Sequence, residues 1–338
     1  MSNIDSGIPL IDLHRHLDGN VRIETIIELG RLHKLPLPAW TVEGMKPFIQ
    51  VSGPQPGVMA FIEKFYWLTQ ILVDYEACKR IAYENVEDAL HEGLDHVELR
   101  FSPRFMAMAH GLDPVKVVEA VCAGVEEGRR AFKVSVKLIG IISRTYGASA
   151  GLQELKALME FKDQISALDL AGDEEKFPAK LFTEHFKLAR AAGWKITVHA
   201  GEGVGPESIR EAMRDLGAVR IGHGLSAVKD PWLIDELRDK RIGIECNLTS
   251  NVQTSSVENY ASHPIRQFVE HGLLATINTD DPAISAIDLR HEYDVATLLA
   301  GLSRDQIRTI QHNALAIAFL SSEEKSELVK RKGKLAGL

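Results

Sequence analysis

Residues 8–19 read IPLIDLHRHLDG, an apolar run that ends in a cluster of polar side chains. Because side chains alternate along a β-strand, Asp12, His14 and His16 are expected to share one face. Leu13 is expected on the opposite face. Strands of parallel sheets are usually apolar on both faces, so a polar face indicates that its residues have a functional role. Two imidazoles side by side suit a divalent metal, and a pair of hydrogen-bonded structural histidines is the alternative.

The same kind of unit recurs along the chain: a short apolar run, a polar or glycine-rich turn, and an amphipathic helical stretch. The eight runs are Ile8–Leu13, His96–Phe101, Val134–Ile142, Ser166–Leu170, Lys195–Val198, Val219–Ile221, Ile242–Cys246 and Leu274–Asn278. Strands that alternate with helices form parallel sheets with right-handed crossovers. Eight such units favour a closed barrel over an open sheet. We therefore predict an α/β fold of the (β/α)8 TIM-barrel type.

The interval between the first two runs is longer than the others. It reads mostly helical over residues 22–32, 57–71 and 75–92, with proline-rich turns between these stretches. An insertion that directly follows the C-terminal end of a strand lies at the barrel mouth. We therefore expect residues 22–92 to form a helical insertion over that mouth, within a single catalytic barrel domain that spans residues 1–338.

Composition and charge exclude several classes of function. Of the 338 residues, 45% are hydrophobic and 25% charged, and the formal net charge of −8 gives no attraction to nucleic acid or acidic membranes. No apolar run approaches the roughly 20 residues that cross a bilayer, and the N-terminus lacks the features of a secretory signal. We expect a cytoplasmic protein that binds a small molecule. The distant cysteines Cys78, Cys122 and Cys246 suggest neither a disulfide framework nor a thiolate zinc site.

Polar residues gather at the C-terminal ends of the runs, where barrel enzymes hold their active sites. His199 ends the fifth run and Asp280 or Asp281 ends the eighth, and a barrel would bring both to the first run. Imidazole and carboxylate ligands without cysteine favour zinc, with iron, manganese and cobalt as alternatives. A two-metal site typically needs a modified lysine at the end of the fourth strand, where this chain has Leu170-Ala-Gly172. We therefore expect one metal ion per chain.

Three further polar residues stand at strand ends. Glu202 lies three residues after His199, where a carboxyl group can pass protons to a substrate, or can act as a favourable charge at a helix N-terminus. His223 lies between two glycines, which permit a close approach to a ligand. Arg100 could bind an anion, but ion pairing across the barrel mouth is favoured. The glycines of 201–205 lack the spacing and the acidic partner of a dinucleotide-binding site.

Five motifs occur in the order His14-Arg-His-Leu-Asp-Gly19, Leu170-Ala-Gly-Asp-Glu174, His199-Ala-Gly-Glu202, Gly222-His-Gly224 and Thr279-Asp-Asp-Pro282. Together they resemble the signature set of the adenosine deaminase family of the amidohydrolase superfamily. The resemblance runs over nearly the whole chain and also covers Glu98-Leu-Arg-Phe-Ser-Pro103. It implies a (β/α)8 barrel with a helical insertion after the first strand, in agreement with the count of runs.

The resemblance also implies a role for each matching residue. The zinc ligands would be His14, His16, His199 and Asp280. Glu202 would donate a proton to purine N1, and His223 and Asp281 would orient a zinc-bound hydroxide. The substrate-binding residues would be Gly172 at purine N3, Asp281 at N7, and Asp18 with His16 at the ribose hydroxyls.

The activity that follows from the resemblance is hydrolytic deamination of adenosine and deoxyadenosine to inosine and deoxyinosine, with release of ammonia. Zinc lowers the pKa of its water to about 7, and the resulting hydroxide would attack purine C6 once N1 is protonated. Glu202 must then be a neutral acid, so we expect its pKa to be raised. The combined signature of zinc deaminases that act on cytidine or nucleic-acid bases, H-x-E followed by P-C-x-x-C, is absent because the chain has no P-C-x-x-C.

The substrate depends on one residue. Asp18 favours a nucleoside, because relatives that act on the free base commonly carry glutamate at the matching position. A deaminase of adenine or another aminopurine with the same zinc site is the alternative. A purine-binding protein without turnover is disfavoured, because the five residues His14, His16, His199, Glu202 and Asp280 are all present.

Overall fold

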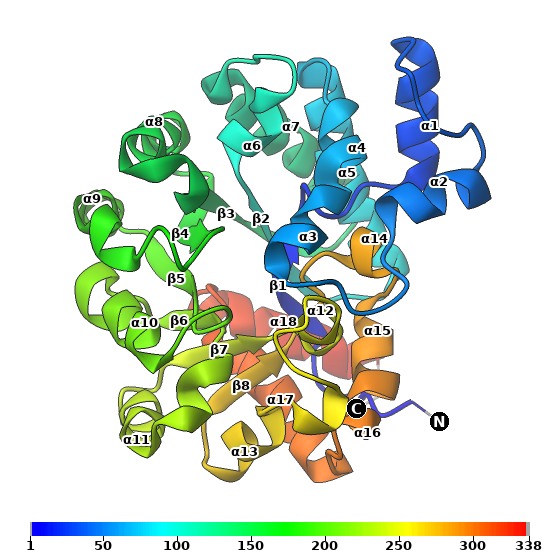
Figure 1. The fold of residues 1–338 in the computed structure, drawn as a ribbon. Coiled ribbons are helices and arrows are strands. Elements are labelled where there is room, and N and C mark those ends of the chain that lie inside the picture. The colour runs from blue at the N-terminus through cyan, green and yellow to red at the C-terminus, as the bar shows by residue number, and fades with distance from the viewer. Residues whose placement is uncertain (1, 336–338) are drawn as a thin grey trace.

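Eight parallel strands form the centre of the fold in a computed structural model that describes residues 2–335 (Figure 1). Neighbouring strands follow the order of the chain: β1 (Ile11–His16), β2 (His96–Phe101), β3 (Ser135–Ser143), β4 (Ile165–Ala171), β5 (Lys195–Ala200), β6 (Arg220–His223), β7 (Gly243–Cys246) and β8 (Leu274–Ile277). Asp280 closes the ring against β1. Its carbonyl accepts from the His16 amide and its amide donates to the His14 carbonyl, both at 2.8 Å. The predicted (β/α)8 barrel is confirmed.

Helices and short 3-10 or π segments connect the strands. After β2 the helices are α6 (Pro103–Met108), α7 (Pro114–Ala131), α8 (Gly147–Met159), α9 (Thr183–Ala191), α10 (Pro206–Glu211), α11 (Pro231–Asp239), α12 (Leu248–Gln253), α13 (Ile265–Glu270), α14 (Pro282–Ser285), α15 (Leu289–His291), α16 (Thr297–Leu299), α17 (Arg304–Ile317) and α18 (Ser322–Leu335). The short segments are η2 (Arg144–Tyr146), η3 (Ala179–Phe182), η4 (Ala212–Leu216), η5 (Leu225–Lys229), η6 (Tyr260–Ser262) and η7 (Glu292–Ala296). Among the described helices, none combines the length and the apolar character that spanning a bilayer requires.

The first strand departs from strict alternation. Between Asp12 and Arg15, three steps along β1 correspond to two steps along β2, so β1 carries a bulge. The bulge turns the Asp12 carboxylate away from the two histidines, and it instead accepts from the Thr279 hydroxyl at 2.6 Å and lies 4.0 Å from Arg15. The prediction that Asp12 shares a face with His14 and His16 is therefore wrong. The strand also extends to His16, beyond the predicted end of the run.

Five helices lie between β1 and β2: α1 (Ile23–Leu32), α2 (Val42–Ile49), α3 (Val58–Ile62), α4 (Tyr66–Gln70) and α5 (Tyr75–His91), with η1 (Glu63–Phe65) before α4. The segment before α3 is hydrogen-bonded to the region that follows β7 and β8, since the Val51 amide donates to the Ile284 carbonyl at 3.0 Å and the Ser255 hydroxyl donates to the Gln55 carbonyl at 2.6 Å. α5 packs against α7, where a Cβ at Gly124 would collide with the backbone of α5. A role of residues 22–92 as a cover stays a prediction.

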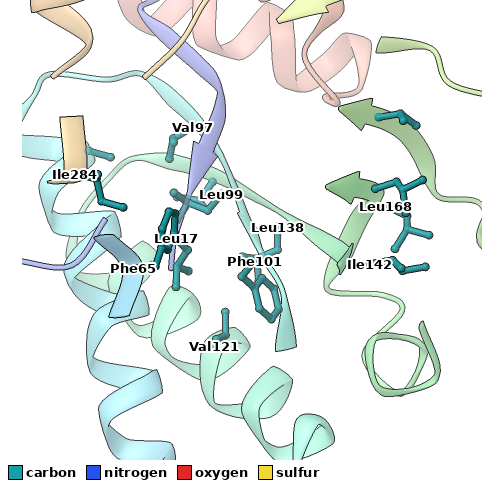
Figure 2. Packing of buried hydrophobic residues seen from close by; sticks show 14 of the residues in the cluster. Leu17, Phe65, Val97, Leu99, Phe101, Val121, Leu138, Ile142, Leu168 and Ile284 are labelled. Carbon is teal, nitrogen blue, oxygen red and sulfur yellow. The ribbon is translucent and has the colours of Figure 1, made fainter. Parts of the chain in front are cut away.

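The apolar core lies between the sheet and the surrounding helices. Figure 2 shows Val97, Leu99 and Phe101 of β2 among this core, with Val121 of α7 beside them. The alternate residues of β2 are Glu98 and Arg100, which are fully buried and pair with charged groups of other strands. The barrel interior is therefore polar and ionic, and the apolar packing that stabilises the fold lies outside the ring.

Candidate metal centre and active site

A cavity of about 230 Å³ opens at the C-terminal ends of the strands. A volume of this order suits a small molecule. Its lining includes every site residue that the family resemblance implies except the fully buried His14: His16, Asp18, Gly172, His199, Glu202, His223, Asp280 and Asp281. Segments far apart in the sequence thus meet at one site, as barrel topology predicts.

Four ligand atoms converge at the floor of this cavity. His14 Nε2 lies 3.1 Å from His199 Nε2 and 3.3 Å from Asp280 Oδ1. His16 Nε2 lies 3.4 Å from each of the same two atoms. Neighbouring ligand atoms on one ion with metal–ligand bonds of 2.0–2.1 Å lie about 2.9–3.4 Å apart. The spacing therefore fits one zinc-sized ion with these four ligands.

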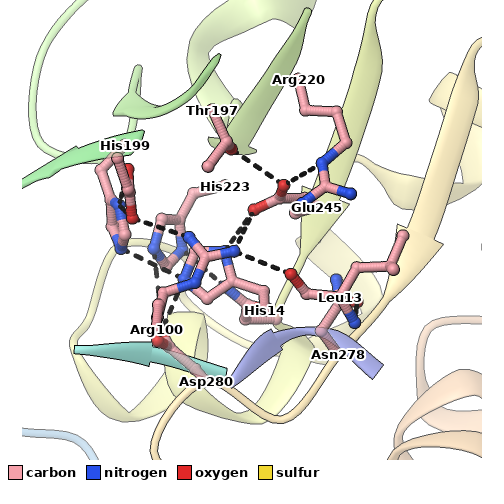
Figure 3. A network of polar contacts seen from close by, with 12 residues as sticks. Leu13, His14, Arg100, Thr197, His199, Arg220, His223, Glu245, Asn278 and Asp280 are labelled. Carbon is pink, nitrogen blue, oxygen red and sulfur yellow. Dashed lines mark hydrogen bonds and ion pairs between the residues drawn. The ribbon is translucent and has the colours of Figure 1, made fainter. Parts of the chain in front are cut away.

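The protonation of two histidines supports the same conclusion. His14 Nδ1 lies 2.7 Å from Glu245 Oε2 (Figure 3). His199 Nδ1 lies 3.0 Å from Asp169 Oδ2. A carboxylate only accepts, so both Nδ1 atoms carry protons. Burial lowers the pKa of His199 to about 3 and also lowers the pKa of His14, so both rings are neutral and their Nε2 lone pairs face each other. A cation between them would relieve this repulsion, and the residues fit a metal.

Asp280 and Asp281 occupy different environments. Asp280 adopts a positive φ of 62°, and its Oδ2 accepts from the Ser250 hydroxyl at 2.8 Å. Asp281 lies next to it, and burial together with the Asp280 charge raises the pKa of Asp281 well above its usual value. A Cβ at Gly19 would collide with the Asp281 carboxylate, so the glycine of the first motif makes room for this side chain. The pair can therefore supply one anionic ligand and one proton-carrying acid.

Glu202 and His223 lie on the other side of Asp280. His223 Nε2 is 3.6 Å from Glu202 Oε2 and 3.8 Å from Asp280 Oδ2. Burial is the main cause that raises the pKa of Glu202, as predicted from the need for a neutral acid. The Glu202 carboxyl group lines the cavity and contacts Asn251 and Ser256 rather than the first turn of α10, which begins at Pro206.

The residues expected near the ribose and purine also line the cavity. The Asp18 carboxylate accepts from the Ser102 amide at 3.2 Å, and its other oxygen lies 3.7 Å from His16 Nδ1. Gly172 has a φ of 108°, and a Cβ there would collide with the Thr145 hydroxyl, so only glycine fits. The lining also has an apolar part, which is formed by Val58, Phe61, Ile62, Phe65, Phe105 and Ile141. The apolar side chains suit the faces of a flat heterocycle and the polar groups suit its edges.

Several residues of the site were not identified from the sequence. Glu245 orients His14. The only feature of the sequence that could have indicated this role is that Glu245 is the single charged residue in the apolar run 242–246. Asp169 orients His199 in the same way. Arg100 bridges these two carboxylates at 2.8 Å each, which confirms the expected ion pairing of Arg100. The loop after β7 also contributes, because Asn251 contacts His223 at 2.9 Å.

Comparisons with known proteins identify the family of this chain. The family model described as adenosine deaminase matches residues 9–333. A curated adenosine deaminase of Klebsiella pneumoniae subsp. pneumoniae is 57% identical over 331 residues, which cover 98% of this chain and 99% of the relative. This coverage leaves no large segment of either protein unmatched.

Two solved structures share the fold. An adenine deaminase from Arthrobacter aurescens superposes with a TM-score of 0.89 at 23% identity, over 98% of this chain and 100% of that chain. An amidohydrolase from Burkholderia ambifaria with bound zinc superposes with a TM-score of 0.86 at 23% identity, over 98% and 92%. At 23% identity these two structures show only that the barrel fold is shared. The family model and the curated relative identify the family within that fold. The chain therefore belongs to the adenosine deaminase family.

Proposed function

We propose that the chain hydrolyses the C6 amino group of adenosine and deoxyadenosine, giving inosine or deoxyinosine and ammonia. The observation that carries this proposal is the buried Glu202, whose pKa is raised and which lines the same cavity as the candidate metal ligands His16, His199 and Asp280. A neutral carboxylic acid next to a metal-activated water is what hydrolysis of an aromatic amidine requires. The similarity to a curated adenosine deaminase supports the same substrate.

We further propose one zinc ion per chain, held by His14, His16, His199 and Asp280. The donor set of three imidazoles and one carboxylate suits zinc. A zinc ion at this position would polarise a water and make it nucleophilic at neutral pH. The distance of 3.1 Å between the Nε2 atoms of His14 and His199 supports the assignment.

The surrounding residues then have distinct tasks. Glu202 in its neutral form donates a proton to purine N1, which makes C6 electrophilic. His223 and Asp281 flank Asp280, where their polar atoms align the attacking water by hydrogen bonds. Correct alignment lowers the barrier because the reacting groups are already oriented.

The substrate is held by groups on opposite sides of the cavity. We propose that the Gly172 amide contacts purine N3, that Asp281 contacts N7, and that Asp18 with His16 binds the ribose hydroxyls. The apolar side chains of α3 and η1, such as Phe61 and Phe65, would pack on the purine face. Because these side chains come from residues 22–92, we also propose that this segment covers the mouth of the barrel.

Removal of the metal is expected to abolish activity. Treatment with a chelator should reduce adenosine turnover to background, and addition of one equivalent of zinc should restore it, because the reaction depends on a metal-activated water. Elemental analysis of the purified protein should give one zinc per chain. Two zinc ions per chain, or full activity of a metal-free preparation, would contradict the single-zinc site.

The substrate is tested by a panel of adenosine, deoxyadenosine, adenine, AMP and methylthioadenosine, followed by the ultraviolet change on deamination. Adenosine and deoxyadenosine should have the highest kcat/KM. AMP should react poorly, because the Asp18 carboxylate at the ribose end of the cavity repels a phosphate group. If adenine or AMP reacted with a kcat/KM about a hundredfold above that of adenosine, roughly 2.7 kcal/mol of transition-state stabilisation, the alternative substrate would be correct.

A further inference from the structure

A chain of buried hydrogen bonds connects the backbone of α13 with the active site. The Ile265 amide donates to His263 Nδ1 at 3.1 Å. His263 Nε2 lies 3.2 Å from Asn251 Oδ1, and Asn251 Nδ2 lies 2.9 Å from His223 Nδ1. His263, Asn251 and His223 are all buried, so water does not compete for these bonds.

The direction of every bond in this chain follows from its first member. A backbone N–H can only donate, so His263 Nδ1 must accept. A neutral imidazole carries one proton, which therefore lies on Nε2 of His263 and points to Asn251. The Asn251 atom that faces it must be the oxygen, so the amide nitrogen faces His223 and donates to Nδ1. The remaining proton of His223 then lies on Nε2.

Two further observations support this direction. Burial lowers the pKa of His263 to about 3, so the ring is neutral at neutral pH and has a single proton. A second amide nitrogen, that of Asn247, lies 3.3 Å from the same Nδ1 atom of His223. Both neighbours of this nitrogen are thus donors, which is consistent with an unprotonated Nδ1.

We propose that Asn251 and His263 are positioning residues that hold His223 as the Nε2–H tautomer. In this form the Nε2–H of His223 faces Asp280 Oδ2, 3.8 Å away, and Glu202 Oε2, 3.6 Å away, both beyond direct hydrogen-bonding distance. A protonated Nε2 has no lone pair for a metal, so His223 stays outside the ligand set although it lies among candidate ligands.

The same amide also reaches the proton donor. Asn251 Nδ2 lies 3.5 Å from Glu202 Oε1, so its second N–H points toward that carboxyl group. One side chain of the loop after β7 thereby sets the orientation of two groups at the reaction centre. Any effect of Asn251 on catalysis rests on the proposed function, whereas the assignment of the His223 tautomer does not.

The tautomer is tested by 15N–1H correlation spectra of the zinc-loaded protein labelled at histidine nitrogens, in which the two neutral tautomers have different patterns. The His223 signals are identified by their absence in His223→Gln. The parent protein should show the Nε2–H pattern for His223. Asn251→Asp replaces the donor with an acceptor and should convert His223 to a form protonated on Nδ1, while Asn251→Leu should leave a mixture of tautomers. An Nδ1–H pattern in the parent, or an unchanged His223 in Asn251→Asp, would overturn the proposal.

Kinetics and matched variants separate positioning from folding. Asn251→Asp should lower kcat by about 10²–10⁴-fold at unchanged zinc content, because a histidine in the wrong tautomer loses its catalytic function. His263→Leu should also lower kcat, and His263→Gln, which retains a donor toward Asn251, should restore most of it. His185 is a buried histidine whose ring contacts the Ala148 carbonyl, and His185→Gln should leave the His223 signals unchanged.

The two proposals fail in different ways. If the spectra change as expected but adenosine is not deaminated by the parent protein, the proposed function is wrong and the tautomer assignment stands. If adenosine is deaminated and His263→Leu and His263→Gln leave both the spectra and kcat equally unchanged, the positioning role is wrong and the function stands.

Discussion

Glu202→Gln is expected to lower kcat for adenosine by about 10²–10⁴-fold, the usual contribution of a general acid. Glutamine has nearly the same shape as glutamic acid, and its amide can form a hydrogen bond to purine N1 but cannot transfer a proton to it. The variant should therefore bind substrate and fail to activate C6. Initial rates of adenosine consumption, measured from the ultraviolet change, give kcat and KM separately.

The zinc content of Glu202→Gln should equal that of the parent protein. The nearest polar partners of the Glu202 carboxylate are Asn251 at 3.5 Å, Ser256 at 3.4 Å and His223 at 3.6 Å, none of which belongs to the proposed ligand set. The matched control is Glu207→Gln, which changes an exposed carboxylate on α10 and should leave kcat unchanged. Loss of zinc together with activity in Glu202→Gln would show that Glu202 is a ligand rather than a proton donor.

The pH profile supplies an independent readout of the same substitution. Burial raises the pKa of Glu202, so its proton-donating form persists to higher pH than that of an ordinary glutamic acid. The kcat of the parent enzyme should fall as the pH rises through this raised pKa, because the acid is then ionised. The residual activity of Glu202→Gln should lack this decline.

The sequence predicts well those site residues that lie at the C-terminal ends of strands. His14, His199 and Asp280 could be brought together because parallel strands of a barrel all present their C-terminal ends at one mouth. The apolar runs locate these ends to within a few residues: β2 matches its predicted run, and β1 extends beyond it because His14 and His16 pair with the backbone of Asp280.

The sequence does not identify the partners in contacts that cross the barrel. Alternation predicts a regular strand, and the bulge in β1 that turns Asp12 away from the histidines has no local signal in the sequence. Glu245 and Asn251 were missed for a related reason. Their partners, His14 and His223, lie more than twenty residues away in the chain, and only the closed ring brings them within hydrogen-bonding distance.

Arg100→Met is expected to lower the free energy of unfolding by about 3–5 kcal/mol, the typical cost of removing one partner from a buried ion pair. Arg100 is 0% exposed. Its guanidinium donates to Asp169, to Glu245 and to the Leu13 carbonyl, each at 2.8 Å. Methionine resembles the aliphatic part of the arginine side chain but lacks the guanidinium, so the two carboxylates have less charge compensation. Urea denaturation of the metal-free protein measures the change without a contribution from bound zinc.

The same substitution should weaken zinc binding by about 10–100-fold, the usual effect of disturbing the partners of metal ligands. Asp169 and Glu245 hold the Nδ1 protons of His199 and His14, and Arg100 fixes both carboxylates at once. Competition with a chelator of known affinity gives the zinc dissociation constant. A change in unfolding free energy below about 1 kcal/mol, with unchanged zinc affinity, would show that the bridge of Arg100 is dispensable.

A control variant and the pH dependence distinguish lost charge compensation from lost packing. Arg130→Met removes an exposed arginine of α7 and should change stability by less than about 0.5 kcal/mol. The Arg100 guanidinium helps to hold the pKa values of Glu245 and Asp169 below their usual range, so its stabilising effect is present above the ordinary carboxyl pKa of about 4. That effect is lost as the pH falls through the lowered pKa values, because protonated carboxyl groups no longer need the cation. The stability difference between Arg100→Met and the parent should therefore shrink toward acid pH, whereas a defect of packing alone would stay constant.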